Sequence, residues 1–514
     1  MDIRHQAGQR LCTGFPGTQL DSDFIRHVRE NKIGNVILFG HNILGREQLH
    51  RLCADIQTLV MESTGYPAFI AIDQEGGPVS RLPEGTAVFP SAMAVAATGD
   101  PDNAYQAGLM TGTELKALGV NVNLAPVMDI NTNPLNPVIG VRSFGDTPDV
   151  VGAYGSQMIR GLMDAGILCA AKHFPGHGDT AVDSHIGLPC VDKTIEELLT
   201  CELLPFQAAI AAGVPAVMIS HILYPRLEAA HVPATMSRQI VTGLLKERLG
   251  FAGLVLSDCM MMGAIASHYG TPAGCLAAAQ AGVDMIFVSH SVALAGEAAA
   301  LMQNAAEDGR LDMMEMEASV SKILACKQKI QSQSVPSFTA AGCETYIKAA
   351  QRMAKEAVTW VNPPETDLFP LGDSPLFVGC PPYRANNASD PVNDSLTFPT
   401  YMARELGGQG IILSPDPDEP EIQAVIKKVP GCSSIVVGTM NAHMRKGQMQ
   451  LLRDLAQTGK SMACVALRNP YDLRDLPSHV SSLAVYGYDA LSLMAAAGVL
   501  SGKIPAGGKL PVKL

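Results

Sequence analysis

The stretch Gly166–Pro189, GILCAAKHFPGHGDTAVDSHIGLP, decides the fold class of this chain. Its first six residues form an apolar run of strand length bounded by breakers, which is typical of a buried strand. The polar remainder is rich in Gly and Pro and is typical of a loop leaving the carboxyl end of that strand. In a parallel α/β protein, this end of the sheet carries the catalytic groups. The stretch therefore predicts an active-site loop.

Similar apolar runs alternate with amphipathic stretches through the first two thirds of the chain. The predicted strands are Asn35–Phe39, Ala68–Ile72, Val120–Leu124, Ile167–Ala171, Ala216–Ile219, Leu254–Leu256 and Asp284–Val288. The predicted helices include Arg46–Thr64, Asp102–Leu118, Thr147–Ala165, Ile195–Ala212 and Gln239–Leu249. An eighth strand is expected near Leu11–Gly17. This number of β/α units favours an N-terminal (β/α)8 TIM-type barrel over an open sheet.

Polar or charged side chains follow five of these strands, as the catalytic end of a barrel requires. They are Asp73, Asp129, the pair Lys172-His173, the pair Ser220-His221, and the pair Ser257-Asp258. Each one alone is equally typical of a helix cap or a turn. Their recurrence at the same end of successive strands favours a shared site.

The helical periodicity stops near Gln331, where a polar, breaker-rich stretch predicts a linker over 331–342. The barrel would then occupy residues 1–330. A second strand–helix alternation predicts a smaller α/β domain of three-layer sandwich type over 343–514. Its expected strands are Pro375–Cys380, Gly410–Leu413, Ser434–Gly438, Met462–Leu467 and Ser482–Tyr486.

Composition excludes several classes of protein. The chain has 514 residues, 47% hydrophobic and 17% charged, with a net charge of −12, so a nucleic-acid partner is not expected. Apolar runs are too short to span a membrane, and the first residues lack the features of a signal peptide. The twelve cysteines are scattered without a C-x-x-C pair, which favours reduced thiols. A cytoplasmic location is therefore expected, whereas the oligomeric state is left open.

The polar loop allows two chemical interpretations. Its metal-competent side chains suit zinc or a metal pair: His173, His177, Asp179, Asp183 and His185. Alternatively, Asp183 orients His185 for general acid–base catalysis. A third possibility is that these side chains only hydrogen-bond the loop to itself.

The motif K-H-F-P-G-H-G-D-T-x-x-D-S-H-x-x-L-P resembles the signature of glycoside hydrolase family 3 β-N-acetylglucosaminidases, the NagZ-like branch. Further blocks resemble this branch in the same order, and they extend into the second domain. They are Asp73–Gly77 with Arg81, Asn123–Asp129, Arg142–Gly145, Ser257-Asp258, Ala281–Asp284, Leu467–Asp472 and the terminal Gly502–Val512. The resemblance covers nearly the whole chain and implies the two-domain form of the family.

The resemblance implies a retaining mechanism with three catalytic residues. Asp258 corresponds to the nucleophile, His185 to the acid/base and Asp183 to the partner of that histidine. An imidazole with an ordinary pKa of about 6.5 is able to donate and accept a proton near neutrality. The sugar-binding positions of the family correspond to Asp73, Arg81, Arg142, Lys172 and His173. No metal or cofactor is expected.

Other polar residues are expected to be structural. Asp129 is predicted to bind backbone amides, and Asp284 to stabilise the fold. His177 and Asp179 are predicted to shape the loop. Lys172 and Arg142 have an alternative role as ion-pair partners of Asp258 or Asp129. Cys259 stands where many relatives of the family carry another residue, and the following Met260–Met262 is expected to form an apolar wall. Glu75 is the carboxylate that could compete for the role of catalytic acid, and it ranks low. His221 is expected either to reach the pocket or to pack beside it.

The favoured function is an exo-acting β-N-acetylhexosaminidase that removes terminal GlcNAc from cell-wall muropeptides or chitin oligosaccharides. The expected partner is thus a small carbohydrate, with no nucleic acid and no membrane. A phosphorylase that releases GlcNAc-1-phosphate is the close alternative. A metallohydrolase and a non-catalytic sugar-binding protein are less favoured.

Overall fold

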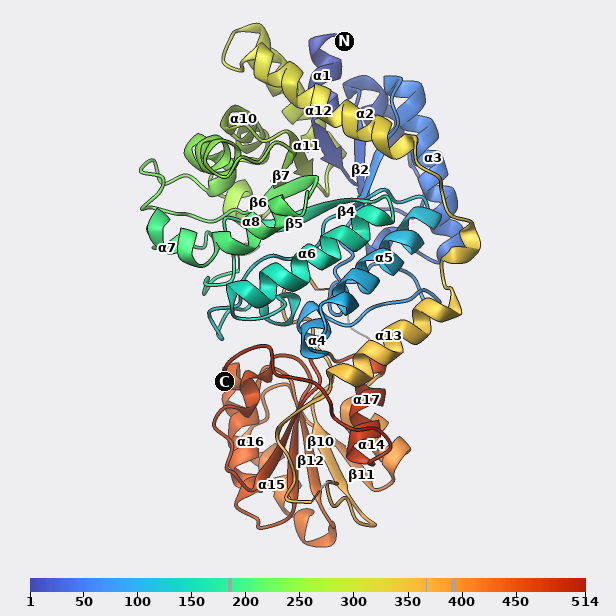
Figure 1. Ribbon diagram of the computed structural model, residues 1–514, viewed down its shortest axis with the longest axis vertical. Helices are drawn as coiled ribbons and strands as arrows, with labels where there is room; N and C mark the ends of the chain where they lie inside the picture. The colour runs from blue at the N-terminus through green and yellow to red at the C-terminus, as the bar shows by residue number, and fades with distance from the viewer. Residues whose placement is uncertain (184–186, 367, 390–393) are drawn as a thin grey trace.

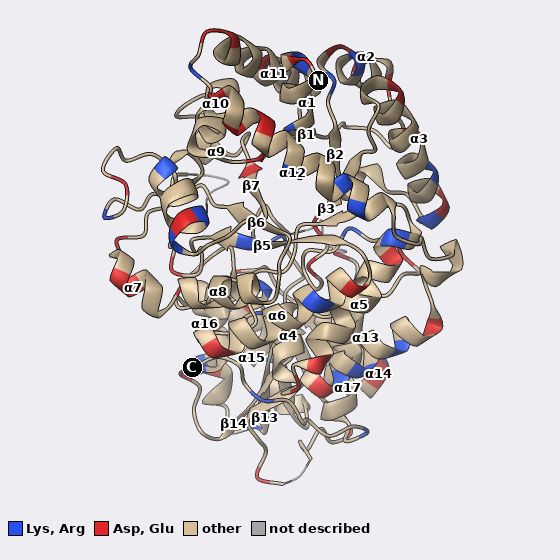
Figure 2. Cartoon of the chain, turned by 45° about the horizontal axis from the view of Figure 1, so that its top comes forward, with Lys and Arg blue, Asp and Glu red and all other residues tan. Residues whose placement is uncertain are grey.

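The structure is a computed structural model that describes residues 1–183, 187–366, 368–389 and 394–514. It contains two α/β units that lie end to end, a closed barrel followed by a smaller sheet (Figure 1). This arrangement confirms the predicted fold class. Lys and Arg residues are interspersed with Asp and Glu over the helices (Figure 2). None of the helices in the described ranges combines the length and apolarity needed to cross a bilayer.

The barrel consists of eight parallel strands in chain order. They are β1 Leu11–Thr13, β2 Asn35–Leu38, β3 Phe69–Ile72, β4 Val122–Asn123, β5 Leu168–Phe174, β6 Ala216–Ile219, β7 Leu254–Cys259 and β8 Met285–Val288. β1 pairs with β2 on one side and with β8 on the other, which closes the barrel. The eighth strand expected near Leu11–Gly17 is therefore confirmed as β1.

Helices surround the barrel and fall close to the predicted ranges. They are α1 Ile3–Gln9, α2 Ser22–Asn31, α3 Arg46–Thr64, α4 Ala92–Ala97, α5 Asp102–Ala117, α6 Pro148–Asp164, α7 Ile195–Thr200, α8 Leu203–Ala211, the π-type helix η4 Gln239–Arg248, α9 Gly263–Ala266, α10 Thr271–Ala281, α11 Val292–Glu307 and α12 Met313–Gln331. The single helix predicted over Ile195–Ala212 is wrong, because the chain breaks there into α7 and α8. Pro205 lies in the first turn of α8, where its missing N–H costs no helical hydrogen bond.

Short 3-10 turns complete this part of the chain and the second unit. They are η1 Gly40–Asn42, η2 Gly140–Arg142, η3 Ala234–Met236, η5 Phe338–Ala340, η6 Val429–Gly431, η7 Ala442–Met444 and η8 Pro470–Leu473.

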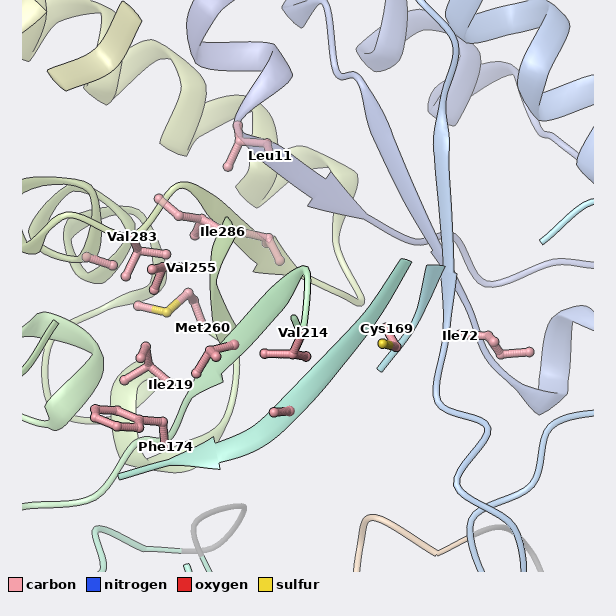
Figure 3. Packing of buried hydrophobic residues seen from close by; sticks show 14 of the residues in the cluster. Leu11, Ile72, Cys169, Phe174, Val214, Ile219, Val255, Met260, Val283 and Ile286 are labelled. Carbon is pink, nitrogen blue, oxygen red and sulfur yellow. The ribbon is translucent and has the colours of Figure 1, made fainter. Parts of the chain in front are cut away.

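The strand side chains alternate between two cores. In β6, Ala216 and Met218 belong to the cluster inside the barrel, whereas Val217 and Ile219 belong to the cluster between strands and helices. This alternation follows from the period of two along a strand. Figure 3 shows part of the outer cluster, including Ile219. Helix α12 covers the end of the barrel where the strands begin, and its Ile323 packs into the inner cluster.

The second unit is a six-stranded sheet in the order β11-β10-β12-β13-β14-β9. Its strands are β9 Thr359–Asn362, β10 Leu376–Gly379, β11 Gln409–Ile412, β12 Ile435–Thr439, β13 Met462–Ala466 and β14 Val480–Ala484. Its helices are α13 Glu344–Ala357, α14 Phe398–Leu406, α15 Glu419–Ile426, α16 Lys446–Ala456 and α17 Ala490–Leu500. Separate hydrophobic clusters cover the two faces of the sheet, as a three-layer sandwich requires.

β9 is a strand that the sequence analysis did not include. It pairs antiparallel with β14 at the edge of an otherwise parallel sheet. The proposed linker over 331–342 lies between the end of α12 and the start of α13, and it contains η5. Helix α13 contacts α4 of the barrel unit as well as α17 of the second unit.

Candidate active site

A cavity of about 660 Å³ opens at the carboxyl ends of the barrel strands. Six of the eight residues predicted for the site line it: Asp73, Arg81, Arg142, Lys172, His173 and Asp258. These residues come from loops after β3 and β4 and from the ends of β5 and β7. Chain positions up to 185 residues apart are thus gathered in one cavity, because parallel strands present their carboxyl ends together.

The remaining two predicted residues belong to the loop after β5. Asp183 is buried but is not part of the cavity lining, and its carbonyl accepts a hydrogen bond from the Gly187 amide at 3.0 Å. His185 lies outside the described residues. Their catalytic roles therefore stay predictions.

A buried network of opposite charges forms part of the cavity wall. Lys172 Nζ lies 2.7 Å from Asp73 Oδ1 and 2.7 Å from Glu75 Oε1. The Arg142 guanidinium donates two hydrogen bonds of 2.8 Å to the same Glu75 carboxylate. The alternative partners considered for both cations, Asp258 and Asp129, are therefore wrong, because these ion pairs run to Glu75 and Asp73.

This network fixes the charge of Glu75. Burial alone would raise the pKa of its carboxyl, but Arg142 and Lys172 outweigh that effect and hold the pKa well below its usual range. Burial alone would likewise lower the pKa of Lys172, which Asp73 and Glu75 raise instead. Glu75 is thus an ionised anchor for two cations and unsuited to donating a proton near neutrality. The sequence feature that points to Glu75 as part of the cavity wall is its position two residues after Asp73.

Asp129 holds the start of the active-site loop. Its carboxylate accepts hydrogen bonds from the backbone amides of His173, at 3.2 Å, and His177, at 2.6 Å. This confirms the prediction that Asp129 binds backbone amides. It also lies 2.7 Å from His173 Nδ1, which leaves Nε2 as the ring nitrogen of His173 for the cavity. Asp129 therefore sets the orientation of an imidazole in the cavity wall.

The next residues of the loop make contacts of the kind predicted to shape it, and His177 also lines the cavity. His177 Nδ1 lies 2.8 Å from Thr180 Oγ1, and burial together with His173 lowers the pKa of His177 to about 4. Asp179 forms an ion pair of 2.8 Å with Lys193. Within the described residues, no three His, Cys, Asp or Glu side chains gather in a metal-binding group.

Asp258 stands at the end of β7 and is half-buried in the cavity wall. Its Oδ1 accepts a hydrogen bond of 2.6 Å from the amide of Cys259, which helps to fix the carboxylate. Burial raises the pKa of the Cys259 thiol, so this unusual neighbour stays neutral and adds no charge beside the carboxylate. Met261 and Met262 line the cavity as the predicted apolar wall, whereas Met260 is buried in the core.

Two other polar residues support the strands from outside the cavity. His221 is buried, with Nδ1 2.8 Å from Thr235 Oγ1 and Nε2 3.0 Å from the carbonyl of Cys259. Of the two positions expected for His221, the packed one is therefore correct. Asp284 accepts hydrogen bonds from the amide of Val255 and the hydroxyl of Ser319, which confirms its structural role.

The second unit also contributes to the cavity, which the sequence analysis did not predict. Its lining includes Arg384, Asn387, Ala388 and Ser389 from the segment after β10. No motif marks this segment, because its role depends on how the two units dock. Contacts across the interface also include residues of the family-like block Leu467–Asp472. There, Asn469 Oδ1 accepts a hydrogen bond from the amide of Val141 at 3.1 Å.

Comparisons with known proteins agree with this geometry. The sequence pattern of the glycosyl hydrolase family 3 N-terminal domain matches residues 10–326. The chain is 30% identical to β-hexosaminidase A of Pseudoalteromonas piscicida, over 96% of this chain and 91% of that protein. It is 37% identical to a β-hexosaminidase of Xylella fastidiosa (strain 9a5c), over 54% of this chain and 83% of that protein. The structure resembles a family 3 β-N-acetylglucosaminidase of Paenibacillus sp. str. FPU-7, with a TM-score of 0.93, 34% identity, and 100% and 99% of the two chains covered.

Proposed function

The chain belongs to glycosyl hydrolase family 3, and from this premise we propose that it is an exo-acting β-N-acetylhexosaminidase that removes terminal GlcNAc with retention of configuration. The names of the relatives support the activity, since they are β-hexosaminidases and a β-N-acetylglucosaminidase. The observation that carries the proposal is the position of Asp258 at the end of β7. There it shares one cavity with the charged groups proposed to bind the sugar.

In the first proposed step, Asp258 attacks the anomeric carbon and forms a covalent glycosyl ester. The bond from that carbon to the leaving oxygen breaks, and His185 donates a proton to this oxygen. Asp183 orients His185 and stabilises its imidazolium form. In the second step, His185 accepts a proton from water, which attacks the same carbon and releases Asp258. Two inversions give net retention.

The proposed sugar-binding residues act through charge that is already arranged. Asp73 accepts hydrogen bonds from sugar hydroxyl groups, while Lys172 and Arg142 donate to others. Glu75 compensates both cations, so the cavity binds a neutral sugar without leaving buried charge uncompensated. His173 presents Nε2 because Asp129 engages Nδ1.

The proposed substrates are cell-wall muropeptides or chitin oligosaccharides with a terminal GlcNAc. The proposed location is the cytoplasm, which suits twelve cysteines that are all free thiols. No cofactor takes part in either step. Phosphate in place of water would release GlcNAc-1-phosphate, and this acceptor is the alternative that the experiment must distinguish.

The test is hydrolysis of nitrophenyl β-glycosides of GlcNAc, GalNAc and Glc, with and without phosphate. We expect preference for GlcNAc, a first product with the β configuration, and a rate that is indifferent to phosphate. A 2-fluoro slow substrate should label Asp258, as identified by peptide mass. Absence of both turnover and labelling would refute the proposal and favour a binding protein.

A further inference from the structure

A second cavity lies at the opposite end of the barrel, where the strands begin. Its volume is about 580 Å³, within the roughly 300–1,000 Å³ that is typical of small-molecule sites. Helix α3 forms one side, and the last turn of α12 with the linker that follows it forms another (Figure 1). Phe69, the first residue of β3, also belongs to the lining. Among the described residues, this cavity shares no lining residue with the one that contains Asp258.

Apolar side chains supply much of the lining and continue to the surface. They include Met61, Pro67, Phe69, Val120, Ile330 and Val335. The side chains of Met61 and Val335 are 38% and 68% exposed, so these two residues lie at the rim of the cavity. Exposed apolar side chains around a cavity are typical of a site that binds an apolar group.

Two amide side chains of the lining are bound to the backbone at the start of β3. Gln57 Nε2 donates to the carbonyl of Ala68 at 3.0 Å, and Gln57 Oε1 accepts from the amide of Ala68 at 2.8 Å. Asn121 Nδ2 donates to the same carbonyl at 2.9 Å, and its Oδ1 accepts from the amide of Ile70 at 2.8 Å. These bonds fix the frame of the cavity and leave the lysines of the lining as its principal donors.

Two buried lysines line the cavity. Lys327 is 2% exposed and Lys116 is 7% exposed. Lys327 Nζ donates to Gln9 Oε1 at 2.8 Å and to the carbonyl of Gly34 at 2.9 Å. Lys116 Nζ donates to Gln333 Oε1 at 3.0 Å. All three acceptors are neutral, and within the described ranges no carboxylate lies at ion-pair distance from either amine. Because lysine is almost never buried without a partner of opposite charge, this pair of side chains points to a ligand with negative charge.

Lys327 is the better placed of the two lysines to bind an anion. An ammonium group has three N–H donors, and the two hydrogen bonds of Lys327 leave one donor for a ligand. Its Nζ lies 5.3 Å from the centre of the Phe69 ring. Burial lowers the pKa of Lys327 to about 7, and the neighbouring Cys12 thiol stays neutral because burial raises its own pKa. A bound anion would offset the effect of burial and favour the charged amine.

The third charged residue of the described lining is Glu62. It forms an ion pair of 3.6 Å with Arg29, and both side chains are more than half exposed. The cavity therefore combines two buried cations with one carboxylate that faces solvent. A carboxylate with an apolar chain suits this wall, because its head needs few donors and its chain covers the apolar side chains.

We propose that this cavity binds an amphipathic monocarboxylate, with its carboxylate on Lys327 and its apolar chain against Met61 and Val335. The site lies at the end of the barrel away from Asp258, so the inference is independent of the proposed function.

The probe is octanoate, and calorimetry of the intact chain measures its binding. The compounds 1-octanol and inorganic phosphate carry the apolar chain and the negative charge separately. We expect saturable binding of octanoate by the wild type, with affinity roughly tenfold lower in Lys327→Met, which removes the charge-assisted hydrogen bond. Octanol and phosphate should each bind at least roughly tenfold more weakly than octanoate. Because binding charges the amine, the wild type should take up about one proton per octanoate at pH 8, and Lys327→Met should take up none.

Val335→Glu is a second variant, which tests the site even if Lys327→Met does not fold. Its side chain is exposed, so the substitution should leave the fold intact while it places a negative charge at the rim and weakens octanoate binding. The matched control is Lys329→Met, which removes an exposed lysine of α12 outside the lining and should leave the affinity unchanged.

Three results would overturn the inference. The first is a wild type that shows no saturable binding of octanoate or takes up no proton on binding it. The second is an affinity for octanoate that is the same in Lys327→Met and Val335→Glu as in the wild type. The third is binding of octanol or phosphate as tight as that of octanoate, since either compound would then account for the site without the other feature.

Discussion

Glu75→Gln tests whether the buried charge network stabilises the barrel. The substitution keeps the side-chain volume and one acceptor oxygen but removes the charge that compensates Arg142 and Lys172. Removing one partner of a buried ion pair destabilises a protein by about 3–5 kcal/mol. Asp73 still contacts Lys172 at 2.7 Å, so we expect the lower end of this range.

This free energy converts to a measurable shift in melting temperature. An unfolding entropy of about 2 cal/mol/K per residue, over the roughly 330 residues of the barrel unit, gives about 0.7 kcal/mol/K. A loss of about 3 kcal/mol should therefore lower the Tm by roughly 4 °C near neutral pH. Calorimetry or thermal unfolding followed by circular dichroism measures this shift.

The pH dependence gives an independent check. The pKa of Glu75 is held below its ordinary value in the folded protein, so its contribution to stability is complete above about pH 4.3, the unfolded value. That contribution is lost as the pH falls toward the folded pKa, whereas Gln does not titrate. The difference in Tm between wild type and Glu75→Gln should therefore narrow below about pH 4.

Glu62→Gln is the matched control, because Glu62 forms only an exposed ion pair of 3.6 Å with Arg29. It should leave the Tm within about 1 °C of the wild type. Equal melting temperatures for Glu75→Gln and wild type at neutral pH would refute the reasoning. The reasoning would also be refuted if the difference in Tm between wild type and Glu75→Gln stayed the same as the pH was lowered.

Three further predictions concern the proposed catalytic residues and a buried lysine. Asp258→Asn should lower kcat by roughly 10⁴-fold or more and prevent labelling by a 2-fluoro substrate; retained labelling would exclude it as nucleophile. His185→Ala and Asp183→Ala should each lower the rate about 10²–10⁴-fold on disaccharides. The activity of His185→Ala should be largely restored on nitrophenyl glycosides, whose leaving group needs no proton. An equal loss of rate on disaccharides and on nitrophenyl glycosides would contradict the role of His185 as the acid. Burial lowers the pKa of Lys327 to about 7, so the wild type should gain stability as the pH rises from about 7 to 10. Stability is measured here as the denaturant concentration at the midpoint of unfolding, and Lys327→Met should show a smaller rise of this midpoint with pH. Curves of midpoint against pH that run parallel for the variant and the wild type would contradict this prediction.

Several features of the fold followed from local sequence patterns. Helix α3 occupies the predicted range Arg46–Thr64, β6 occupies Ala216–Ile219, and α12 ends at Gln331, where the periodicity stops. Hydrophobic periodicity and the positions of Gly and Pro suffice to predict these elements, because each of them buries one regular face. The polar residues at strand ends also predicted where the cavity lies, since parallel strands share one catalytic end and Asp73, Lys172, His173 and Asp258 line it.

Where local patterns were weak, the prediction was incomplete. The edge strand β9 is only four residues long and precedes two prolines, so it carries little periodicity of its own. The break between α7 and α8 depends on Pro205 falling within a first helical turn. A run of apolar residues does not reveal such a break.

The sequence by itself determined the alternation of strands and helices, the two-unit architecture and six of the charged or polar residues that line the cavity. The tertiary structure decided which charges compensate one another and which side of the cavity the second unit covers. Lys172 pairs with Glu75 across nearly one hundred residues, and Arg384 of the second unit lines a cavity that is otherwise built mainly by the barrel. Such contacts depend on strand register and on domain docking, which no local spacing of residues records.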